Sequence, residues 1–443
     1  MSTALVDERG STRSADDATR LLRRVTLLAA GFAVLGVLYV IANRSVGLVL
    51  GSRASDLDIN LVAARRLVEG HDLYDGAASR LEGMRHVTSH LRTAYHDTFT
   101  SFIGAPLVAA LHVPFTGLGH STAVALFRLV DLVTVVGAAF LTVRAVPRYS
   151  RLPANFVAVG ALALSYPLVR TLEVGQFHGL VMVGLALGVW GVATDRIGIA
   201  GVGLGLAAAL KLSPVLLLVY LAARGRRQVV LPAALTFVAL SAGTALMGRP
   251  SAIVTWIGDV VPKISGGTSY IGNQSVPAWI DRMVMRSDDV LAQAPLGATR
   301  MLGPLLALAG CGLLWACCRR RLAVAPLELG GVIVVMLLAG PLTWDHYYVW
   351  AIIPVVLLAD VEAWLGLSSR LRVAGVALLG VAITAWSLPP EYSSPAALAR
   401  DWNVRVSGSP YPVAGILVFV LIVMLLHGHS GLKRPGLQAV VSA

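Results

Sequence analysis

The stretch that decides the fold class is VTLLAAGFAVLGVLYVIANRSVGLV, residues 25–49. A helix that crosses a membrane needs about 20 consecutive, mostly apolar residues, and this run is long enough. It is too long for the core of a signal peptide, and it lacks an A-x-A cleavage site. The preceding residues 1–24 are polar and end in Arg20, Arg23 and Arg24. We therefore expect a retained membrane anchor whose N-terminus lies in the cytoplasm.

The rest of the chain shares the apolar character of this run. Of the 443 residues, 56% are hydrophobic and 14% are charged, whereas a soluble domain carries about 25% charged residues. Because a backbone in lipid must satisfy its own hydrogen bonds, the spans are expected to be helices. The net charge of +12 fits basic cytoplasmic loops that contact anionic membrane lipids. No basic stretch is interleaved with aromatic residues, so nucleic-acid binding is not expected. The predicted fold class is an all-α polytopic integral membrane bundle.

Together with this first run, the apolar runs of the chain predict ten to twelve spans. The clearest are 25–49, 122–143, 154–170, 176–194, 229–247, 301–318, 326–343, 347–366, 371–388 and 411–427. Two further runs, 101–115 and 198–222, contain prolines, which disrupt helix interiors. They are predicted to be dipping or paired half-helices; the alternative is twelve plain crossings.

Basic loops placed on the cytoplasmic side put the loops at about 50–100 and 248–300 outside. The domain prediction is a cytoplasmic tail at 1–24, one membrane domain at 25–430 and a second cytoplasmic tail at 431–443. Four polar clusters then fall on the outer side: Asp56-Leu57-Asp58, Gly175-Gln176-Phe177-His178, Asn273-Gln274-Ser275 and Trp344-Asp345-His346. Polar groups at membrane depth are costly and usually functional, so we expect the clusters to converge.

The acidic pair Asp56 and Asp58 opens a predicted amphipathic helix. Leu57, Leu61, Ala64 and Val68 share one predicted face, while Arg65, Arg66 and Glu69 lie on others. One interpretation is that the acids only complement the helix dipole after Ser55, an N-cap residue. Another is a metal site. The functional interpretation is that a carboxylate acts as general base and takes the proton of an attacking sugar hydroxyl.

The other clusters also have two interpretations each. Asp345 and His346 either start a helix within an aromatic interface belt or contact a phosphate leaving group. Gln176 and His178 either cap a helix or bind substrate. Asn273-Gln274-Ser275 either matches an N-glycosylation acceptor, a pattern that often arises by chance, or carries amides in Asn273 and Gln274 that suit sugar hydroxyls. Lys211, inside an apolar run, either reaches the interface or binds a phosphate.

The sequence also limits the donor. It has no G-x-x-x-x-G-K-[ST] loop, which is the signature of ATP-driven pumps, and no cytoplasmic nucleotide-sugar domain. An outward-facing transferase cannot use a cytosolic nucleotide sugar, so a membrane-borne polyprenyl-phosphate sugar fits best. Nothing in the sequence requires a metal or a cofactor, because Cys311, Cys317 and Cys318 lack zinc spacing.

At these residues the chain resembles the actinobacterial polyprenyl-phosphate-dependent glycosyltransferases of the GT-C superfamily, glycosyltransferase family 87. The resemblance covers residues 25–365 and is strongest to mannosyltransferases that extend phosphatidylinositol mannosides. Its motifs are Asp56-Leu57, Ala63-Ala64, Gly70, Leu73-Tyr74-Asp75, Phe99-Thr100-Ser101-Phe102, Lys211 to Pro214, Asn273-Gln274-Ser275 and Trp344-Asp345-His346. The chain departs from the family pattern at Asn60, Ser101 and His178.

The resemblance implies an inverting enzyme of the plasma membrane with its active site on the outer face. Its donor would be polyprenyl-phosphate mannose, its acceptor a lipid-linked mannoside and its product an α-1,2 linkage. The expected roles are Asp56 as base and His346 and Lys211 on the donor phosphate. The expected substrate-binding residues are Asp58, Tyr74, Gln176, His178, Asn273, Gln274, Trp344 and Asp345. The alternatives are an arabinofuranosyltransferase that uses polyprenyl-phosphate arabinose, a membrane transporter or lipid flippase, and a non-catalytic assembly partner.

Overall fold

The computed structural model describes residues 2–43, 55–76, 102–247, 250–285, 295–319, 325–390 and 401–429. Every regular element within these residues is a helix, and one isolated bridge pairs Asn273 with Trp344. The all-α prediction is confirmed. Most of the predicted outer loop 50–100, part of the loop 248–300 and the C-terminal tail 431–443 lie outside the described residues.

Six of the described helical segments are long and apolar enough to cross a membrane: Thr19–Ala42, His120–Val143, Arg227–Met247, Gly297–Cys318, Ser369–Ser387 and Pro410–Gly428. They belong to α1 (Ser2–Asn43), α6 (His120–Val143), η4 with α12 (Arg227–Val229, Val230–Met247), η6 with α17 (Gly297–Met301, Leu302–Cys318), α21 (Ser369–Ser387) and α24 (Pro410–His429). Because α1 begins at Ser2, the segment predicted as a tail continues the first helix. The chain is a multi-pass membrane protein.

Other apolar runs fold as broken or shorter helices. The run 154–170 follows η3 (Arg148–Ser150) and divides into α7 (Arg151–Leu164) and α8 (Tyr166–Val174), which are bent by 54° and count as a seventh span if taken together. The shorter apolar helices include α9 (His178–Ala193), α10 (Ile197–Leu210) and α18 (Pro326–Ala339). The described residues therefore hold fewer full-length spans than the ten to twelve predicted.

Both predicted irregular segments are confirmed as irregular. The run 101–115 forms only α5 (Pro106–His112) and η2 (Val113–Phe115), and the run 198–222 breaks between α10 and α11 (Val215–Ala223). Lys211 is extended at this break, with φ −144° and ψ 132°. In a continuous helix the ring of Pro214 would clash with the Leu210 carbonyl and could not donate a hydrogen bond to it, so α10 ends at Leu210.

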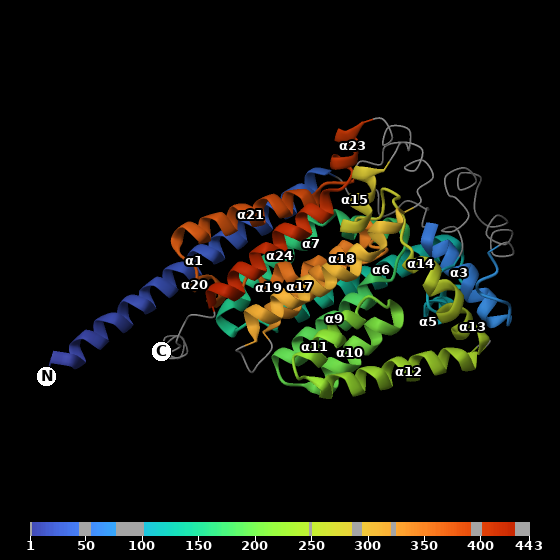
Figure 1. The fold of residues 1–443 in the computed structure, drawn as a ribbon, viewed down its shortest axis with the longest axis horizontal. Coiled ribbons are helices and arrows are strands. Elements are labelled where there is room, and N and C mark those ends of the chain that lie inside the picture. The colour runs from blue at the N-terminus through green and yellow to red at the C-terminus, as the bar shows by residue number, and fades with distance from the viewer. Residues whose placement is uncertain are drawn as a thin grey trace.

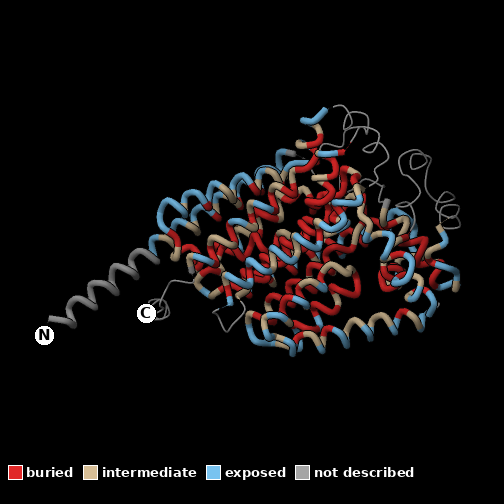
Figure 2. Tube along the Cα trace, in the orientation of Figure 1, coloured by how far each residue is buried: buried red, intermediate tan, exposed pale blue. Residues whose placement is uncertain are grey.

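The core of the bundle is α18 together with a chain of short helices, η7 (Asp345–Ala351), α19 (Ile352–Leu357) and α20 (Val361–Leu365). Residues Leu327 to Ala339 of α18 are all buried, which is typical of a helix that is apolar all round. Figure 2 shows this buried interior, with exposed residues along the outer helices. In a membrane, these outer faces meet lipid.

Short helices gather at the end of the bundle opposite the two termini (Figure 1). They are α3 (Ser55–Val68), α5, α13 (Ser251–Thr255), η5 (Trp256–Val260), α14 (Val261–Ser265), α15 (Val276–Val284) and α23 (Trp402–Ser407). The four predicted polar clusters lie at this end, and we call it the polar end.

Candidate active site

Helix α3 carries the two acidic residues at its first turn, where the unpaired backbone N–H groups favour negative charge. Leu57, Leu61 and Ala64 are buried as the predicted apolar face requires. The prediction is wrong for Val68, which is 61% exposed, and for Arg66, which is buried. Arg66 is buried because its Nε donates to the Asp72 carbonyl at 2.8 Å, in the turn that ends the helix.

Asp56 contacts a residue 120 positions away. The Gln176 amide donates from Nε2 to Oδ2 of Asp56 at 2.5 Å, which brings the first two predicted clusters together. The other amide atom, Gln176 Oε1, is buried and has no hydrogen-bond partner among the described residues. The carboxylate is therefore oriented from the α8–α9 side, and an unused acceptor lies beside it.

Asp58 pairs with a residue that sequence reasoning missed. His120 Nε2, at the start of α6, lies 2.7 Å from Asp58 Oδ1. Burial raises the pKa of Asp58 above its ordinary value; the hydrogen bond and the charge of His120 act in the opposite direction, and the charge of Asp56 adds to the rise. We call Asp56, Asp58, His120 and Gln176 the carboxylate cluster.

The α8–α9 turn, residues 175–177, presents Gln176 on one side and leads into His178 on the other. Ser165 caps α8 by accepting from the Leu168 N–H at 3.1 Å. Gly175 ends α8 with φ +75°, a left-handed conformation that glycine adopts without a steric penalty. The sharp reversal that follows is what places two polar side chains, two residues apart, at the polar end.

His178, His346, Lys211 and Tyr347 form a second group, the histidine cluster. The ring centroids lie 4.9 Å apart for His178 and His346, and 4.7 Å apart for His178 and Tyr347. Lys211 Nζ donates to the Tyr347 hydroxyl at 2.7 Å. Both ring nitrogens of His178 and Nε2 of His346 are buried without a hydrogen-bond partner among the described residues. Lys211 and a protonated imidazole in one place would suit an anionic group that arrives with a ligand, because an imidazole nitrogen donates to an anion only when it carries a proton.

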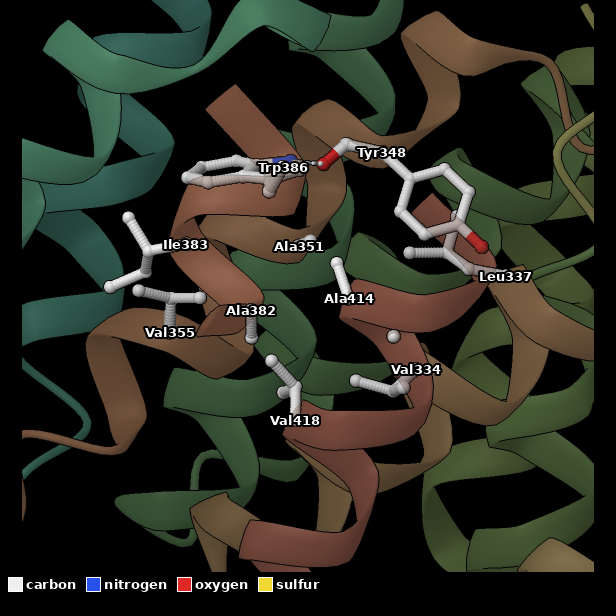
Figure 3. Close-up of a pocket in the computed structure, with 11 residues that line it drawn as sticks. Val334, Leu337, Tyr348, Ala351, Val355, Ala382, Ile383, Trp386, Ala414 and Val418 are labelled. Atoms are coloured by element: carbon white, nitrogen blue, oxygen red, sulfur yellow. Dashed lines mark hydrogen bonds between the residues drawn. The ribbon is translucent and has the colours of Figure 1, made fainter. Parts of the chain in front are cut away.

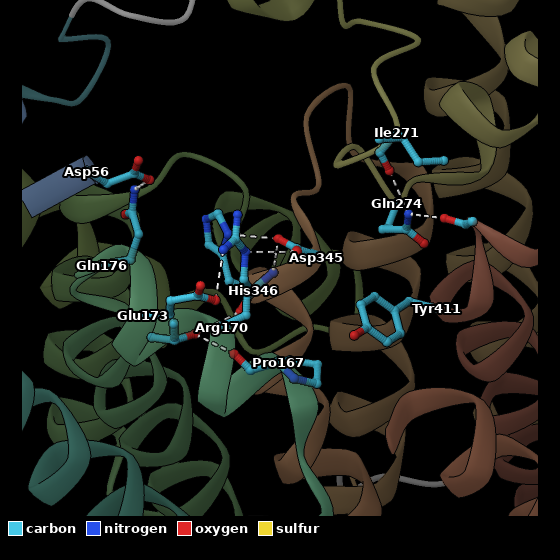
Figure 4. Close-up of polar contacts among 12 residues, drawn as sticks. Asp56, Pro167, Arg170, Glu173, Gln176, Ile271, Gln274, Asp345, His346 and Tyr411 are labelled. Carbon is cyan, nitrogen blue, oxygen red and sulfur yellow. Dashed lines mark hydrogen bonds and ion pairs between the residues drawn. The ribbon is translucent and has the colours of Figure 1, made fainter. Parts of the chain in front are cut away.

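Asp345 fixes the orientation of His346. Its Oδ1 lies 2.9 Å from His346 Nδ1 and also accepts from the His346 backbone N–H at 2.7 Å. An ionised carboxylate only accepts hydrogen bonds, so Nδ1 carries the proton and Nε2 is the nitrogen turned toward the cluster. Arg170 Nε lies 3.4 Å from Asp345 Oδ2, and Arg170 Nη1 lies 2.8 Å from Glu173 Oε2 (Figure 4). Arg170 is a second residue that sequence reasoning missed; its only signal was a charge at the end of an apolar run.

Asn273 and Gln274 are fully buried, and the structure uses their amides to join two loops. Asn273 donates to the Thr268 and Pro341 carbonyls at 2.9 and 2.8 Å and accepts from the Thr343 and Ser275 N–H groups. Gln274 donates to the Ile271 and Gly408 carbonyls, both at 2.7 Å. In Figure 4, Gln274 lies apart from Asp56, on the other side of Asp345. A sugar-binding role for these two residues stays a prediction.

Two aromatic residues complete the predicted set. Tyr74 donates to the Gly104 carbonyl at 2.9 Å and stacks on Phe102, so it joins α3 to the segment before α5. Trp344 packs edge-on against Tyr270 at a centroid distance of 6.0 Å. The aromatic residues that follow it are not an interface belt, because Tyr348 and Trp350 are buried.

An apolar cavity lies behind η7, between α18, α21 and α24 (Figure 3). It is lined mainly by small and aliphatic side chains, with Tyr348 and Trp386 as its aromatic members. Trp386 donates to the Tyr348 carbonyl at 3.1 Å. The cavity walls carry no charged group, so we place the chemistry at the two polar clusters. Within the described residues, no three His, Cys, Asp or Glu side chains are grouped so as to hold a metal ion.

Comparison with known proteins identifies the family of the chain. The chain matches glycosyltransferase family 87 over residues 102–343. It is 26% identical over 386 residues to the polyprenol-phosphate-mannose-dependent alpha-(1-2)-phosphatidylinositol mannoside mannosyltransferase of Mycobacterium tuberculosis, covering 83% of each chain. It is 29% identical over 266 residues to the polyprenol-phosphate-mannose-dependent alpha-(1-2)-phosphatidylinositol pentamannoside mannosyltransferase of Mycolicibacterium smegmatis, covering 56% of this chain and 58% of that one. No solved structure matches significantly. The family expected from the order of the motifs is thus confirmed: the chain belongs to glycosyltransferase family 87 and is a multi-pass membrane glycosyltransferase.

Proposed function

We propose that this enzyme transfers mannose from a polyprenyl-phosphate mannose donor to a lipid-linked mannoside of the phosphatidylinositol mannoside type. The observation that carries the proposal is the carboxylate of Asp56, oriented by Gln176, which lies two residues before His178 of the histidine cluster. The activities for which the relatives are named supply the sugar, the donor class and the acceptor class. The reaction completes an α-1,2 linkage in a glycolipid of the cell envelope.

Asp56 is the general base. The acceptor hydroxyl gives its proton to the Asp56 carboxylate as the hydroxyl oxygen attacks C1 of mannose. The bond between C1 and the phosphate oxygen breaks, its electron pair leaves with the polyprenyl phosphate, and the new glycosidic bond forms. One displacement at C1 inverts its configuration. Gln176 holds the base through Nε2, and its Oε1 accepts a sugar hydroxyl.

The histidine cluster receives the leaving phosphate. Lys211 supplies a positive charge, and His346 acts as an imidazolium: its Nδ1–H donates to Asp345, which orients the ring, and its Nε2–H donates to the leaving phosphate. Negative charge grows on the phosphate as the C1–O bond breaks. Groups already aimed at that position stabilise the transition state more than the bound donor, which is the condition for faster catalysis. The polar end lies on the outer face of the plasma membrane, where a lipid-borne donor is accessible.

The test is transfer by the purified protein in proteoliposomes. Wild-type protein receives polyprenyl-phosphate mannose or polyprenyl-phosphate arabinose, each with a phosphatidylinositol mannoside acceptor, and the products are identified by mass spectrometry and linkage analysis. We expect a mannose product with an α-1,2 bond. Arabinose transfer alone would replace the mannose assignment. Movement of the donor across the bilayer with no glycosidic product from either donor would overturn the proposal in favour of a flippase.

The two clusters have different proposed roles, so one variant from each can be compared in the same assay. Asp56→Asn keeps the shape of the side chain but removes the base, so product should be lost while donor binding remains. Lys211→Met removes the charge at the phosphate, so we expect weaker donor binding that excess donor partly restores. If both variants lost binding and turnover equally, the division of labour between the two clusters would be wrong.

A further inference from the structure

Three polar side chains of α6 each bond a different element of the active site. His120 contacts Asp58 of α3, Arg128 contacts the end of α8, and Asp131 contacts the start of α9. Eleven residues separate His120 from Asp131, which is about three helical turns, so both lie on one side of α6. A single membrane-spanning helix therefore touches every element that presents the carboxylate cluster.

Arg128 binds the end of α8. It is buried, its Nε donates to the Leu172 carbonyl at 2.7 Å, and its Nη2 donates to the Glu173 carbonyl at 3.2 Å. The last carbonyls of a helix have no partner within the helix and carry partial negative charge. The guanidinium satisfies two of them from a neighbouring helix, so the last turn of α8 is tied to α6.

Asp131 binds the start of α9 in the complementary way. It is 3% exposed, and its Oδ1 accepts from the Gly179 backbone N–H at 2.7 Å. The first N–H groups of a helix favour a carboxylate. A Cβ at Gly179 would collide with the Thr134 hydroxyl and lie 2.6 Å from the Asp131 carbonyl oxygen. The absence of a side chain at Gly179 is what lets α9 begin directly against α6.

The α8–α9 turn lies between these two anchors. On one side of it Gln176 bonds Asp56, and on the other His178 faces His346. Charged groups within a membrane are costly and rare, so a buried arginine and a buried aspartate three residues apart need a reason. We propose that Arg128 and Asp131 are positioning residues: they hold the α8–α9 turn so that Gln176 meets Asp56 while His178 faces His346. We call the bonds from Arg128 and Asp131 to the two helix ends the clamp. Its effect on catalysis rests on the proposed function, whereas the clamp itself does not.

The experiment compares four variants with the wild type in proteoliposomes. Asp131→Asn keeps an oxygen that accepts from Gly179, and Asp131→Leu removes it at similar size. Arg128→Lys keeps the charge but loses the forked contact with two carbonyls. Thr142→Val is the control, because Thr142 is buried on α6 and its hydroxyl donates within that helix, to the Ala138 carbonyl. Each protein is measured for kcat, for donor KM and for deuterium exchange of the peptide that spans residues 170–180.

We expect Asp131→Leu to lower kcat about 100-fold with little change in donor KM, because a displacement of about 1 Å at catalytic groups costs that much. Exchange in the 170–180 peptide should rise in the same variant. Arg128→Lys should show both effects more weakly, and Asp131→Asn and Thr142→Val should resemble the wild type. A wild-type kcat in Asp131→Asn would show that Asp131 acts as a hydrogen-bond acceptor that positions the turn. A carboxylate that takes part in the reaction could not be replaced by asparagine.

Two results would overturn the clamp. One is wild-type kcat and wild-type exchange in both Asp131→Leu and Arg128→Lys. The other is Asp131→Asn as slow as Asp131→Leu with unchanged exchange, which would make Asp131 a proton-carrying group. If Asp131→Leu does not fold, Arg128→Lys decides alone. If the wild type transfers no mannose, the proposed function fails, while the exchange measurements still decide whether the clamp exists.

Discussion

At the scale of single residues, the pairs that matter join distant parts of the chain. Asp56 and Asp58 are visible in the sequence as an acidic first turn, and His346 as part of a polar cluster. Their partners could not be predicted, because His120 is 62 positions from Asp58 and Arg170 is 175 positions from Asp345. The spacing of residues in the sequence predicts which side chains are neighbours along one helix. It does not predict these contacts, because they depend on how separate helices pack.

The Asp345–His346 pair gives the first residue-scale prediction. Asp345→Asn removes the charge that holds His346 Nδ1, so Nε2 is presented less well to the donor phosphate. We expect donor KM to rise about 10-fold, the scale of one hydrogen bond to a charged group. Glu173→Gln is the control, because Glu173 pairs with the same Arg170, whereas Asp345 holds His346 Nδ1. Steady-state kinetics with varied donor check this, and equal KM values for wild type and Asp345→Asn would contradict it.

Asp58 gives a pH prediction. Burial raises its pKa above the ordinary 3.8, so the folded protein holds this proton more tightly than the unfolded chain does. The resulting stabilisation of the folded protein is fully present below pH 3.8, the ordinary pKa of the group. It is lost as the pH rises through the raised pKa of the folded protein. The Tm of the wild type relative to Asp58→Asn should therefore fall as the pH rises above 3.8 and through the raised pKa of Asp58. A relative Tm that climbs over this range would mean that His120 holds Asp58 ionised more strongly than burial opposes it.

At the scale of elements, apolar runs predict helices but not their lengths. The break at Lys211 and the short helix in 101–115 could be predicted because proline marks them. The run 347–366 could not, because three short buried helices and one crossing helix have the same apolar composition. The predicted face of α3 fails at Val68 and Arg66 because the turn after the helix, not its periodicity, decides which side chains are covered.

The loop junction at Asn273 gives an element-scale prediction. Its side chain makes four hydrogen bonds with backbone groups of two loops, and Asn273→Leu leaves those groups buried and unpaired. We expect a loss of about 3 kcal/mol or more, since each buried unpaired group costs about 1–3 kcal/mol. Ser407→Ala on α23 is the control, because Ser407 is exposed. Chemical unfolding in detergent checks the difference, and equal stabilities of the two variants would refute it.

At the scale of the whole molecule, the four clusters predicted to converge do meet at one end of the bundle (Figure 1). Composition and the order of motifs were enough to predict the membrane class and the family. They could not give the clamp on α6, because Arg128 and Asp131 lie in a run that is otherwise apolar and their partners are backbone groups with no sequence signature.

The orientation in the membrane gives a prediction for the whole molecule. His71, just after α3, and Asp195, between α9 and α10, are exposed at opposite ends of the bundle. A membrane-impermeant maleimide on intact cells should label His71→Cys, whereas Asp195→Cys should be labelled only after permeabilisation. The reverse pattern would place the polar end in the cytoplasm and would contradict the use of an outward-facing lipid donor.

The central claim, that Asp56 is the general base, is tested most directly by the kcat of Asp56→Asn with saturating donor and acceptor. The control is Glu69→Gln, which neutralises an exposed carboxylate just past the other end of α3. We predict a kcat at least about 100-fold below the wild type for Asp56→Asn, the usual scale of general-base catalysis, and an unchanged kcat for Glu69→Gln. A kcat for Asp56→Asn within twofold of the wild type would contradict the assignment.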